Sequence, residues 1–285
     1  MQFGVEHVNA AGTSMSSQSM SLLAFLRHAA IAGQGPGTGF LPTVTRGIGL
    51  LLFYERYIHL GPGVNLVGFS LPAIHDPTEK GDFSTIAGKA FADFLAKGIL
   101  GATFTFTYEA ALANLGLPIT GHRPDFLCTL PNGQFSLESK GLGTPSVGPQ
   151  VIDEAKTQAG SGAIQVQYSY ASITYDLYGE PRCHLRDPTA GEVPAPRKPH
   201  RQLARAYYKE IIRDLSDHKQ TATERVAERE FSSYPFQSLW GPLRFLVDRD
   251  VEARIRESDK VLRGFEPISD ERYYVDRDGI GISRG

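Results

Sequence analysis

The feature that most constrains the fold is residues 123–141, where Asn132-Gly133 separates two runs that are typical of β-strands. An Asn-Gly pair between alternating apolar and polar residues strongly indicates a two-residue, type I′ hairpin turn. With Asn132 and Gly133 as the loop, Leu130 faces Phe135, and the pairing continues outward from there. The stretch therefore predicts a β-hairpin with one mostly apolar face.

The predicted register places three charged side chains together on the opposite face. Leu127 pairs with Glu138 and Asp125 pairs with Lys140, so Asp125, Glu138 and Lys140 lie within about one cross-strand spacing of each other. A slip of one residue would send one strand's side chains to the other face. Pro124 suits the first position of a strand, because it cannot donate a hydrogen bond to the ladder.

Two interpretations of this charged face remain open. The first is a surface hairpin with an Asp–Lys ion pair and a neighbouring glutamate. The second is half of a metal site, because two adjacent carboxylates are unfavourable without a cation between them. Carboxylate and carbonyl oxygens suit Mg²⁺ or Mn²⁺. The apolar Leu127 and the glycine-rich loop after the hairpin favour an end that is not fully solvated.

These residues resemble the PD-(D/E)XK, or restriction-endonuclease-like, nuclease superfamily. The match consists of Pro124-Asp125, a hairpin, and Glu138-Ser139-Lys140, preceded by the helix pattern GKAFADFLAKGI and a strand that ends in Tyr-Glu. It covers roughly residues 82–179. The resemblance implies an α/β fold with a restriction-endonuclease-like core, in which a mixed sheet is flanked by helices.

The resemblance also implies a role for each motif residue. Asp125 and Glu138 would bind one or two Mg²⁺ (or Mn²⁺) ions, and the Ser139 carbonyl would complete the metal shell. The metal would polarise a phosphodiester and help to generate hydroxide. Lys140 would orient or deprotonate the attacking water, or stabilise charge in the transition state.

The chain departs from the family pattern at the third acid. The first core helix of the family often carries a glutamate at a position that falls near Gly88-Lys89, and neither residue is acidic. Asp93, Asp82 or Glu109 would be the substitute, so the number of metal ions stays open. The helix after the hairpin often supplies a Gln or Lys to the site, and the candidates there are Gln158 and Lys156.

Basic residues give candidate contacts to nucleic acid. The net charge of −2 argues against binding by bulk charge, but residues 182–213 hold eight Lys or Arg against three acids, a local net of +5. Such a segment either contacts phosphates or forms an ordinary solvated helix face. The candidate nucleic-acid contacts are His122 and Arg123 in the loop before the hairpin, Lys156 in the helix after it, and Arg197, Lys198, Arg201 and Arg205.

The rest of the chain is expected to extend the core. Residues 1–75 form an N-terminal extension whose first 20 residues are flexible or loosely docked, 76–180 the nuclease core, and 181–285 a Pro-rich linker and a mostly helical region. Within them, helices are expected over 21–31, from Asp82 or Ser84 after a turn cluster at 75–82, and over 150–158. Strands are expected over 102–110 and 164–179. Residues 43–60 and 64–71 fit helix or strand, and TATERVAEREF is expected to be helical.

The apolar runs, the N-terminal residues and the cysteines indicate the cellular compartment. Apolar runs fall far short of the roughly 20 residues that span a bilayer, and the N-terminus lacks the pattern of a signal peptide. Cys128 and Cys183 cannot form a disulfide framework. These features predict a cytoplasmic protein with reduced thiols.

The sequence thus predicts a divalent-metal-dependent DNA endonuclease, acting in restriction, defence, transposition or repair, as a homodimer or with a partner subunit. One alternative keeps the fold as a catalytically decayed module that binds nucleic acid or a protein. Another is an unrelated protein whose hairpin face is exposed and has no acidic pocket. The chain has no HExxH or Cys/His zinc pattern.

Overall fold

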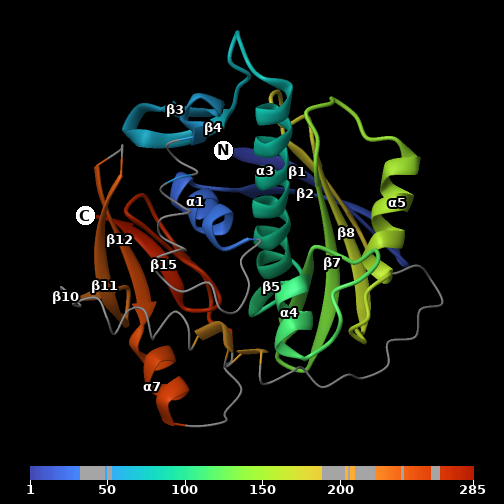
Figure 1. Ribbon diagram of the computed structural model, residues 1–285. Helices are drawn as coiled ribbons and strands as arrows, with labels where there is room; N and C mark the ends of the chain where they lie inside the picture. Colours follow the sequence, from blue (N-terminus) through green and yellow to red (C-terminus); the bar gives the residue numbers. More distant parts are fainter. Residues whose placement is uncertain are drawn as a thin grey trace.

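The structure is a computed structural model that describes residues 1–32, 49, 53–187, 203, 204, 206–208, 222–238, 241–257 and 264–285. In these residues two large β-sheets lie on either side of a pair of helices, as Figure 1 shows. Trp240, which its apolar surroundings in FQSLWGPLRFL predict to be a packing residue of a helix, lies outside them. No helix in the described part of the chain is both long enough and apolar enough to cross a membrane.

The larger sheet has seven strands in the order β2-β1-β9-β8-β7-β6-β5. Neighbours are antiparallel except for the parallel pairs β1–β9 and β7–β8. The expected mixed sheet flanked by helices is therefore confirmed. The strands are β1 (Gln2–Asn9), β2 (Gly12–Ser19), β5 (Phe104–Thr107), β6 (Phe126–Leu130), β7 (Gly133–Gly141), β8 (Tyr168–Tyr175) and β9 (Arg182–Arg186). The helices are α1 (Leu22–Ile31), α3 (Pro77–Gly98), α4 (Tyr108–Asn114) and α5 (Pro149–Gly160).

The N-terminal residues are part of this sheet, so the expectation of a flexible or loosely docked start was wrong. Strand β1 lies between β2 and β9, and Phe3 and Val5 on alternate positions are buried. The Met1 ammonium donates hydrogen bonds to the carbonyls of Met20 and Leu66. The alternating pattern was visible in the sequence, but the polar β2 that completes the hairpin obscured it. The division into 1–75, 76–180 and 181–285 stays a prediction.

The C-terminal part of the chain forms a second sheet, in the order β10-β11-β12-β15-β14-β13. Its strands are β10 (Ala222–Val226), β11 (Arg229–Ser238), β12 (Gly241–Asp248), β13 (Ile268–Ser269), β14 (Tyr273–Val275) and β15 (Ile280–Arg284), and the helix α7 (Arg249–Glu257) follows β12. The expected mostly helical region was therefore wrong, because TATERVAEREF forms the β10–β11 hairpin. Burial of Phe231 and Tyr234 in an interior strand outweighs a weak local helix preference.

A small hairpin occupies much of the described part of the two ambiguous segments before α3, while residues 43–48 and 50–52 lie outside the described residues. Strand β3 (Ile58–Gly61) pairs with β4 (Asn65–Phe69), and short 3₁₀ turns occupy Glu55–Tyr57 and Pro62–Val64. Phe69 of β4 packs against Phe25 of α1, so the small hairpin covers one end of the helical layer.

The two cysteines of the chain are both buried free thiols, as the sequence indicated.

Helix α3 begins earlier than the sequence suggested. The Asp76 carboxylate caps it by accepting from the amides of Thr78 and Glu79 at 2.7 and 3.3 Å, and Pro77 holds the first helical position. The turn expected at 75–82 is therefore the first part of the helix. An Asp-Pro pair is a recognised helix start, because Pro needs no partner for a backbone N–H there.

Helix α3 approaches β7 backbone to backbone at one point. A Cβ atom on Gly88 would lie 2.6 Å from the amide nitrogen of Gly141 and 2.8 Å from the carbonyl carbon of Lys140. Only glycine permits this approach, since real Cβ contacts are longer. The contact fixes the height of α3 over the end of β7, beside the residues of the predicted site.

This contact predicts opposite effects for two Gly→Ala changes on the same helix. Gly88→Ala is expected to destabilise the protein by about 1–3 kcal/mol, because the backbones must separate. Gly81→Ala, where a Cβ would meet nothing within 4 Å, is expected to stabilise it by about 0.5–1 kcal/mol through helix propensity. Urea unfolding of the two variants measures both. Equal effects would show that the approach of α3 to β7 is not tight.

Candidate active site

The hairpin that carries the site is present, but its register differs from the prediction by two residues. Phe126 pairs with Leu137 and Leu130 pairs with Gly133, so the loop residues are Pro131 and Asn132. The predicted pairing of Leu130 with Phe135 was therefore wrong. Because side chains alternate with a period of two, a shift of two keeps every side chain on its predicted face.

The turn itself explains the shift. A type I′ turn needs positive φ at both loop residues, and neither Asn132 nor Gly133 has positive φ here. Pro131 fixes its own φ near −65°, which suits the second position of a type I turn and excludes the I′ form. Glycine then follows at the fourth position, where type I turns favour it. Proline thus decides the turn over the Asn-Gly signal.

Asp125 immediately precedes β6, at the open end of the hairpin where the two strands separate. Its amide donates a hydrogen bond to Oε2 of Glu138 at 3.1 Å. Its carboxylate Oδ2 accepts from the amide and the hydroxyl of Ser139 at 3.1 and 2.6 Å. Its other oxygen, Oδ1, lies 2.9 Å from Nζ of Lys89 on α3. Four donor and acceptor contacts thus hold the Asp125 side chain and backbone in one place.

Glu138 and Lys140 lie on the same face as predicted. The Glu138 side chain is 1% exposed, and its Oε1 is 2.6 Å from Nζ of Lys140. Lys140 also donates to Oε1 of Gln158 on α5 at 3.3 Å. Nε2 of Gln158 donates in turn to the carbonyl of Arg123 at 3.0 Å. Gln158 therefore links Lys140 to the segment that leads into Asp125.

The two carboxylates perturb each other. Burial, and secondarily the nearby charge of Asp125, raise the pKa of Glu138 to about 7, and Lys140 only partly opposes this rise. A buried glutamate that titrates near neutral pH is typical of functional sites, because stability alone would not favour it.

A pocket of about 350 Å³ opens beside these residues. It is lined by side chains that include Lys89, Glu109, His122, Arg123, Asp125 and Gln158. An exposed hairpin with no acidic pocket was the expectation of the purely structural alternative. The burial of Glu138 and the presence of Asp125 and Glu109 in the lining of a pocket differ from that expectation.

The other candidate residues have different partners, although Glu109 lines the same pocket as Asp125. Glu109 is in the first turn of α4, not at the end of a strand, and pairs with Arg123. Lys156 donates to the backbone carbonyl of Ser169 on β8, so its ammonium is directed at the sheet. Asp82 is exposed and Asp93 belongs to a separate buried network. Arg197, Lys198, Arg201 and Arg205 lie outside the described residues.

Sequence reasoning missed the role of Lys89. The resemblance marks Gly88-Lys89 only as the place of a missing acid and predicts no contact for the lysine. The signal available was its position directly after the glycine that lets α3 approach β7. In the structure Lys89 is the residue of α3 that reaches Asp125.

The donor set fits a hard divalent cation. Asp125 and Glu138 supply oxygen ligands of the kind that Mg²⁺ and Mn²⁺ prefer, and their mutual repulsion is relieved by a cation between them. Ser139 fixes Asp125 through its amide and hydroxyl. A ligand role for the Ser139 carbonyl stays a prediction.

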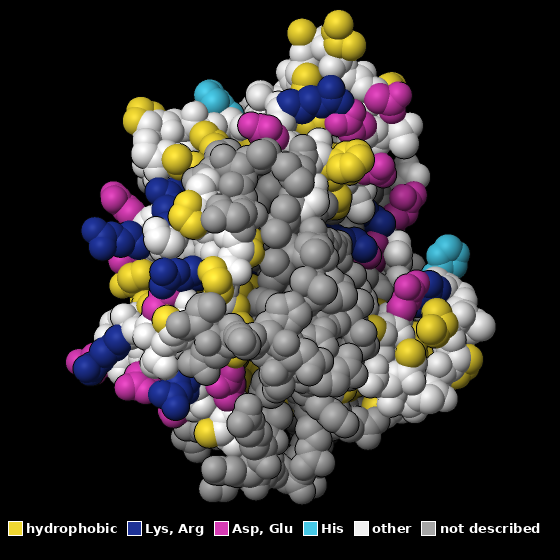
Figure 2. Space-filling view, turned by 60° about the vertical axis from the view of Figure 1, so that its left-hand side comes forward, with side chains coloured by type: hydrophobic (Ala, Val, Ile, Leu, Met, Phe, Trp, Pro, Cys, Tyr) yellow, Lys and Arg dark blue, Asp and Glu magenta, His cyan; other side chains and the backbone are white. Residues whose placement is uncertain are grey.

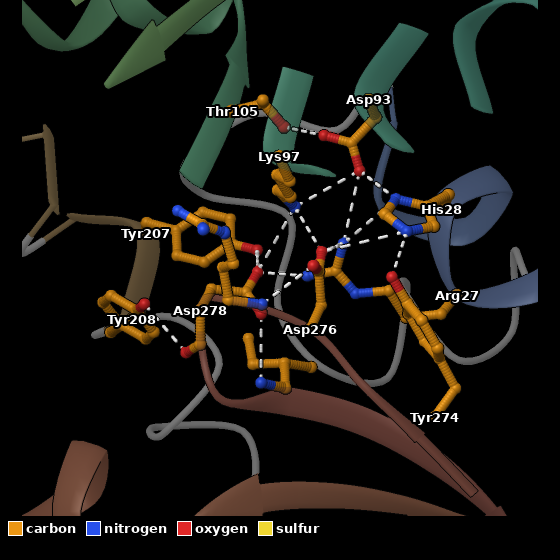
Figure 3. Close-up of polar contacts among 12 residues, drawn as sticks. Arg27, His28, Asp93, Lys97, Thr105, Tyr207, Tyr208, Tyr274, Asp276 and Asp278 are labelled. Carbon is orange, nitrogen blue, oxygen red and sulfur yellow. Dashed lines mark hydrogen bonds and ion pairs between the residues drawn. The ribbon is translucent and has the colours of Figure 1, made fainter. Parts of the chain in front are cut away.

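A second group of potential ligands lies in a buried network between α1, α3 and the C-terminal sheet (Figure 3). One ligand atom each of His28, Asp93 and Asp276 lies within 4.8 Å of the others. Arg27 already contacts both acids, with Nη1 3.2 Å from Asp93 Oδ2 and 2.5 Å from Asp276 Oδ2. The carboxylates thus have internal cations, and this group fits a structural role better than a metal site.

Within the network, His28 is held in one tautomer. Its Nδ1 lies 2.6 Å from Asp93 Oδ2 and its Nε2 lies 2.8 Å from the Tyr274 hydroxyl. Burial lowers the pKa of His28, so the ring is neutral at pH 7, with Nδ1 donating to Asp93. Burial raises the pKa of Asp93, but Lys97, His28 and Arg27 outweigh that effect and hold it well below its ordinary value.

Comparison of the chain with protein-family models, curated proteins and solved structures gives no match. The evidence for a function therefore comes from the chain's own residues: the contacts of Asp125, Glu138 and Lys140, and the pocket beside them.

Proposed function

We propose that this protein is a divalent-metal-dependent endonuclease that hydrolyses phosphodiester bonds in DNA, with a PD-(D/E)XK-type core. The observation that carries the proposal is the convergence of Asp125, Glu138 and Lys140 where β6 and β7 separate, next to a pocket. The order α3, β5, β6–β7, α5 and β8 also follows the order expected for such a core.

The chemistry assigned to the residues is as follows. When bound by Asp125 and Glu138, Mg²⁺ or Mn²⁺ would polarise the phosphodiester and make water a stronger nucleophile. Lys140 holds the attacking water or stabilises negative charge on the phosphoryl oxygens, and Gln158 fixes the direction of its ammonium. In the hydrolysis the water oxygen bonds to phosphorus, one ester P–O bond breaks, and a proton goes to the departing oxygen.

The loop that lines the pocket would contact the nucleic acid beside the site. His122 and Arg123 lie there, and each can donate a hydrogen bond to a phosphate. On the face shown in Figure 2, the described Lys and Arg side chains are interspersed with acids and do not form one basic patch. Binding by local contacts, not by bulk charge, therefore fits the net charge of −2. Contacts from Arg197, Lys198, Arg201 and Arg205, a homodimer or partner subunit, and a cytoplasmic location stay predictions.

A second candidate function is a decayed nuclease module that binds nucleic acid without cutting it. The observation that favours it is the Lys89–Asp125 ion pair, which occupies a predicted metal ligand. The intact Glu138–Lys140–Gln158 contacts favour the enzyme, because binding alone has no need of a lysine placed between two site residues.

The decisive experiment is cleavage of supercoiled plasmid and of single-stranded DNA with Mg²⁺, Mn²⁺ or EDTA. The wild type is expected to cut only with metal, and Asp125→Ala to fall to the EDTA level. The matched control is Asp153→Ala, because Asp153 is exposed on α5 and pairs only with Arg186 among the described contacts. Binding without cutting in every condition would establish the decayed module instead.

A further inference from the structure

Lys89 makes a contact that the proposed function does not use. Its ammonium is 2.9 Å from Oδ1 of Asp125, and its side chain is 27% exposed. It lines the same pocket as Asp125 and Gln158. The ion pair is thus at the edge of the pocket, where a substrate group can reach it.

The position of Lys89 is set by the backbone. The close approach of Gly88 to Gly141 fixes α3 over the end of β7, and Lys89 is the next residue along the helix. Its four-carbon stem leaves the ammonium free to move by several ångströms once the ion pair breaks. A fixed backbone position combined with a mobile ammonium suits a residue that exchanges one ionic partner for another.

The oxygens of Asp125 are divided between two kinds of donor. Oδ2 accepts twice from Ser139, and Oδ1 is the oxygen that faces Lys89. A metal ion that binds Asp125 through Oδ1 must take the place of the Lys89 ammonium. The two cations compete for one ligand atom.

The charges around the site agree with such a competition. Asp125 and ionised Glu138 carry two negative charges, and Lys89 and Lys140 balance them without a metal. Adding a divalent ion gives an excess of two positive charges, which favours release of a cation from the carboxylates and binding of an anion in the pocket. A phosphodiester supplies that anion.

We propose that Lys89 is an internal counter-ion that leaves Asp125 when one divalent metal ion binds, and then contacts the phosphate of the DNA substrate. A second divalent ion would raise the excess at the site to four positive charges, so the site takes a single metal. This inference rests on the proposed function and adds the metal stoichiometry and a positioning residue to it.

The test measures metal binding without DNA, which is independent of cleavage. In Lys89→Met the stem remains and the charge is lost, so the Mn²⁺ affinity of the full-length protein, followed by calorimetry, is expected to rise about tenfold. With saturating metal, its cleavage rate is expected to fall at least tenfold. Tighter metal binding together with slower cutting is a result that a merely structural role would not give.

Control variants separate this effect from overall charge and from folding. Lys80→Met makes the same charge change on α3, about 13 Å away along the helix axis, where Lys80 lies over the Tyr178 ring. It should change neither quantity. Lys89→Arg should keep the wild-type Mn²⁺ affinity and part of the cleavage, and circular dichroism checks that each variant is folded.

Two results would overturn the inference alone. One is a wild type that binds and cuts while Lys89→Met binds Mn²⁺ no more tightly than Lys80→Met does. The other is two Mn²⁺ ions per wild-type chain. A wild type that neither binds Mn²⁺ nor cuts DNA would instead overturn the proposed function, and this inference with it.

Discussion

Glu138→Gln is expected to make the metal-free protein more stable at pH 8 and to abolish cleavage. The Glu138 side chain is 1% exposed, and burial together with Asp125 raises its pKa from 4.5 to about 7. At pH 8 the folded protein must hold an ionised carboxylate that the burial disfavours. Glutamine has nearly the same shape and no charge, so the variant avoids this penalty.

The sign of the pH dependence follows from linkage. Between pH 4.5 and about 7 the folded state retains the Glu138 proton and the unfolded state has lost it. The free energy of unfolding therefore falls as pH rises through this window, and is constant above it. A rise from 4.5 to about 7 corresponds to at most about 3 kcal/mol. Glu138→Gln should gain about 1–3 kcal/mol at pH 8 and nothing at pH 4.

The measurement is urea unfolding in EDTA at the two pH values, followed by the plasmid assay with Mg²⁺. Cleavage should fall by about 10²–10⁴-fold, because the amide is a poor ligand for a hard cation. Glu180→Gln is the control, since that side chain is 87% exposed, and it should change neither stability nor cleavage. A loss of stability in Glu138→Gln at pH 8 would show that Glu138 is there to hold the fold.

The site was predictable to the extent that it is local. Asp125, Glu138 and Lys140 are within sixteen residues of each other in one hairpin, and alternation alone fixes which face they share. The register was missed because Pro131 and Asn132-Gly133 favour different turns, and the sequence pattern does not rank them. The error had no effect on the site, because a shift of two residues preserves the faces.

Contacts between distant segments could not be predicted in the same way. Lys89 contacts Asp125 only because two glycines 53 positions apart allow α3 to approach β7. The local sequence pattern of neither segment predicts this contact. The C-terminal strands were mistaken for helices because their Glu, Arg and Ala residues favour helix locally, while burial in an interior strand decides otherwise.

Arg27→Met is expected to destabilise the protein by about 3–5 kcal/mol, a large part of the 5–15 kcal/mol that holds a typical domain folded. The Arg27 side chain is 0% exposed and contacts Asp93, Asp276 and Asp278, three carboxylates whose side chains are likewise fully buried. Methionine has a similar volume but no charge, so the change removes the cation and leaves little cavity.

The remaining groups do not replace the guanidinium. Lys97 lies 3.1–3.5 Å from the same three acids, and one ammonium cannot balance three carboxylates. The Tyr207 hydroxyl donates to Asp278 at 2.7 Å but carries no charge. Uncompensated charge therefore stays buried between α1, α3 and the C-terminal sheet, and the contact between these layers weakens.

Urea unfolding measures the effect, with Arg182→Met as the control. Arg182 is 55% exposed and pairs with Glu180, so its loss should change the free energy of unfolding by less than about 1 kcal/mol. Adding Asp278→Asn to Arg27→Met removes one unbalanced charge and keeps an acceptor for Tyr207, so it should recover part of the lost stability. Failure of this second change to recover any would mean that the packing of Arg27, and not its charge, joins α1 and α3 to the C-terminal sheet.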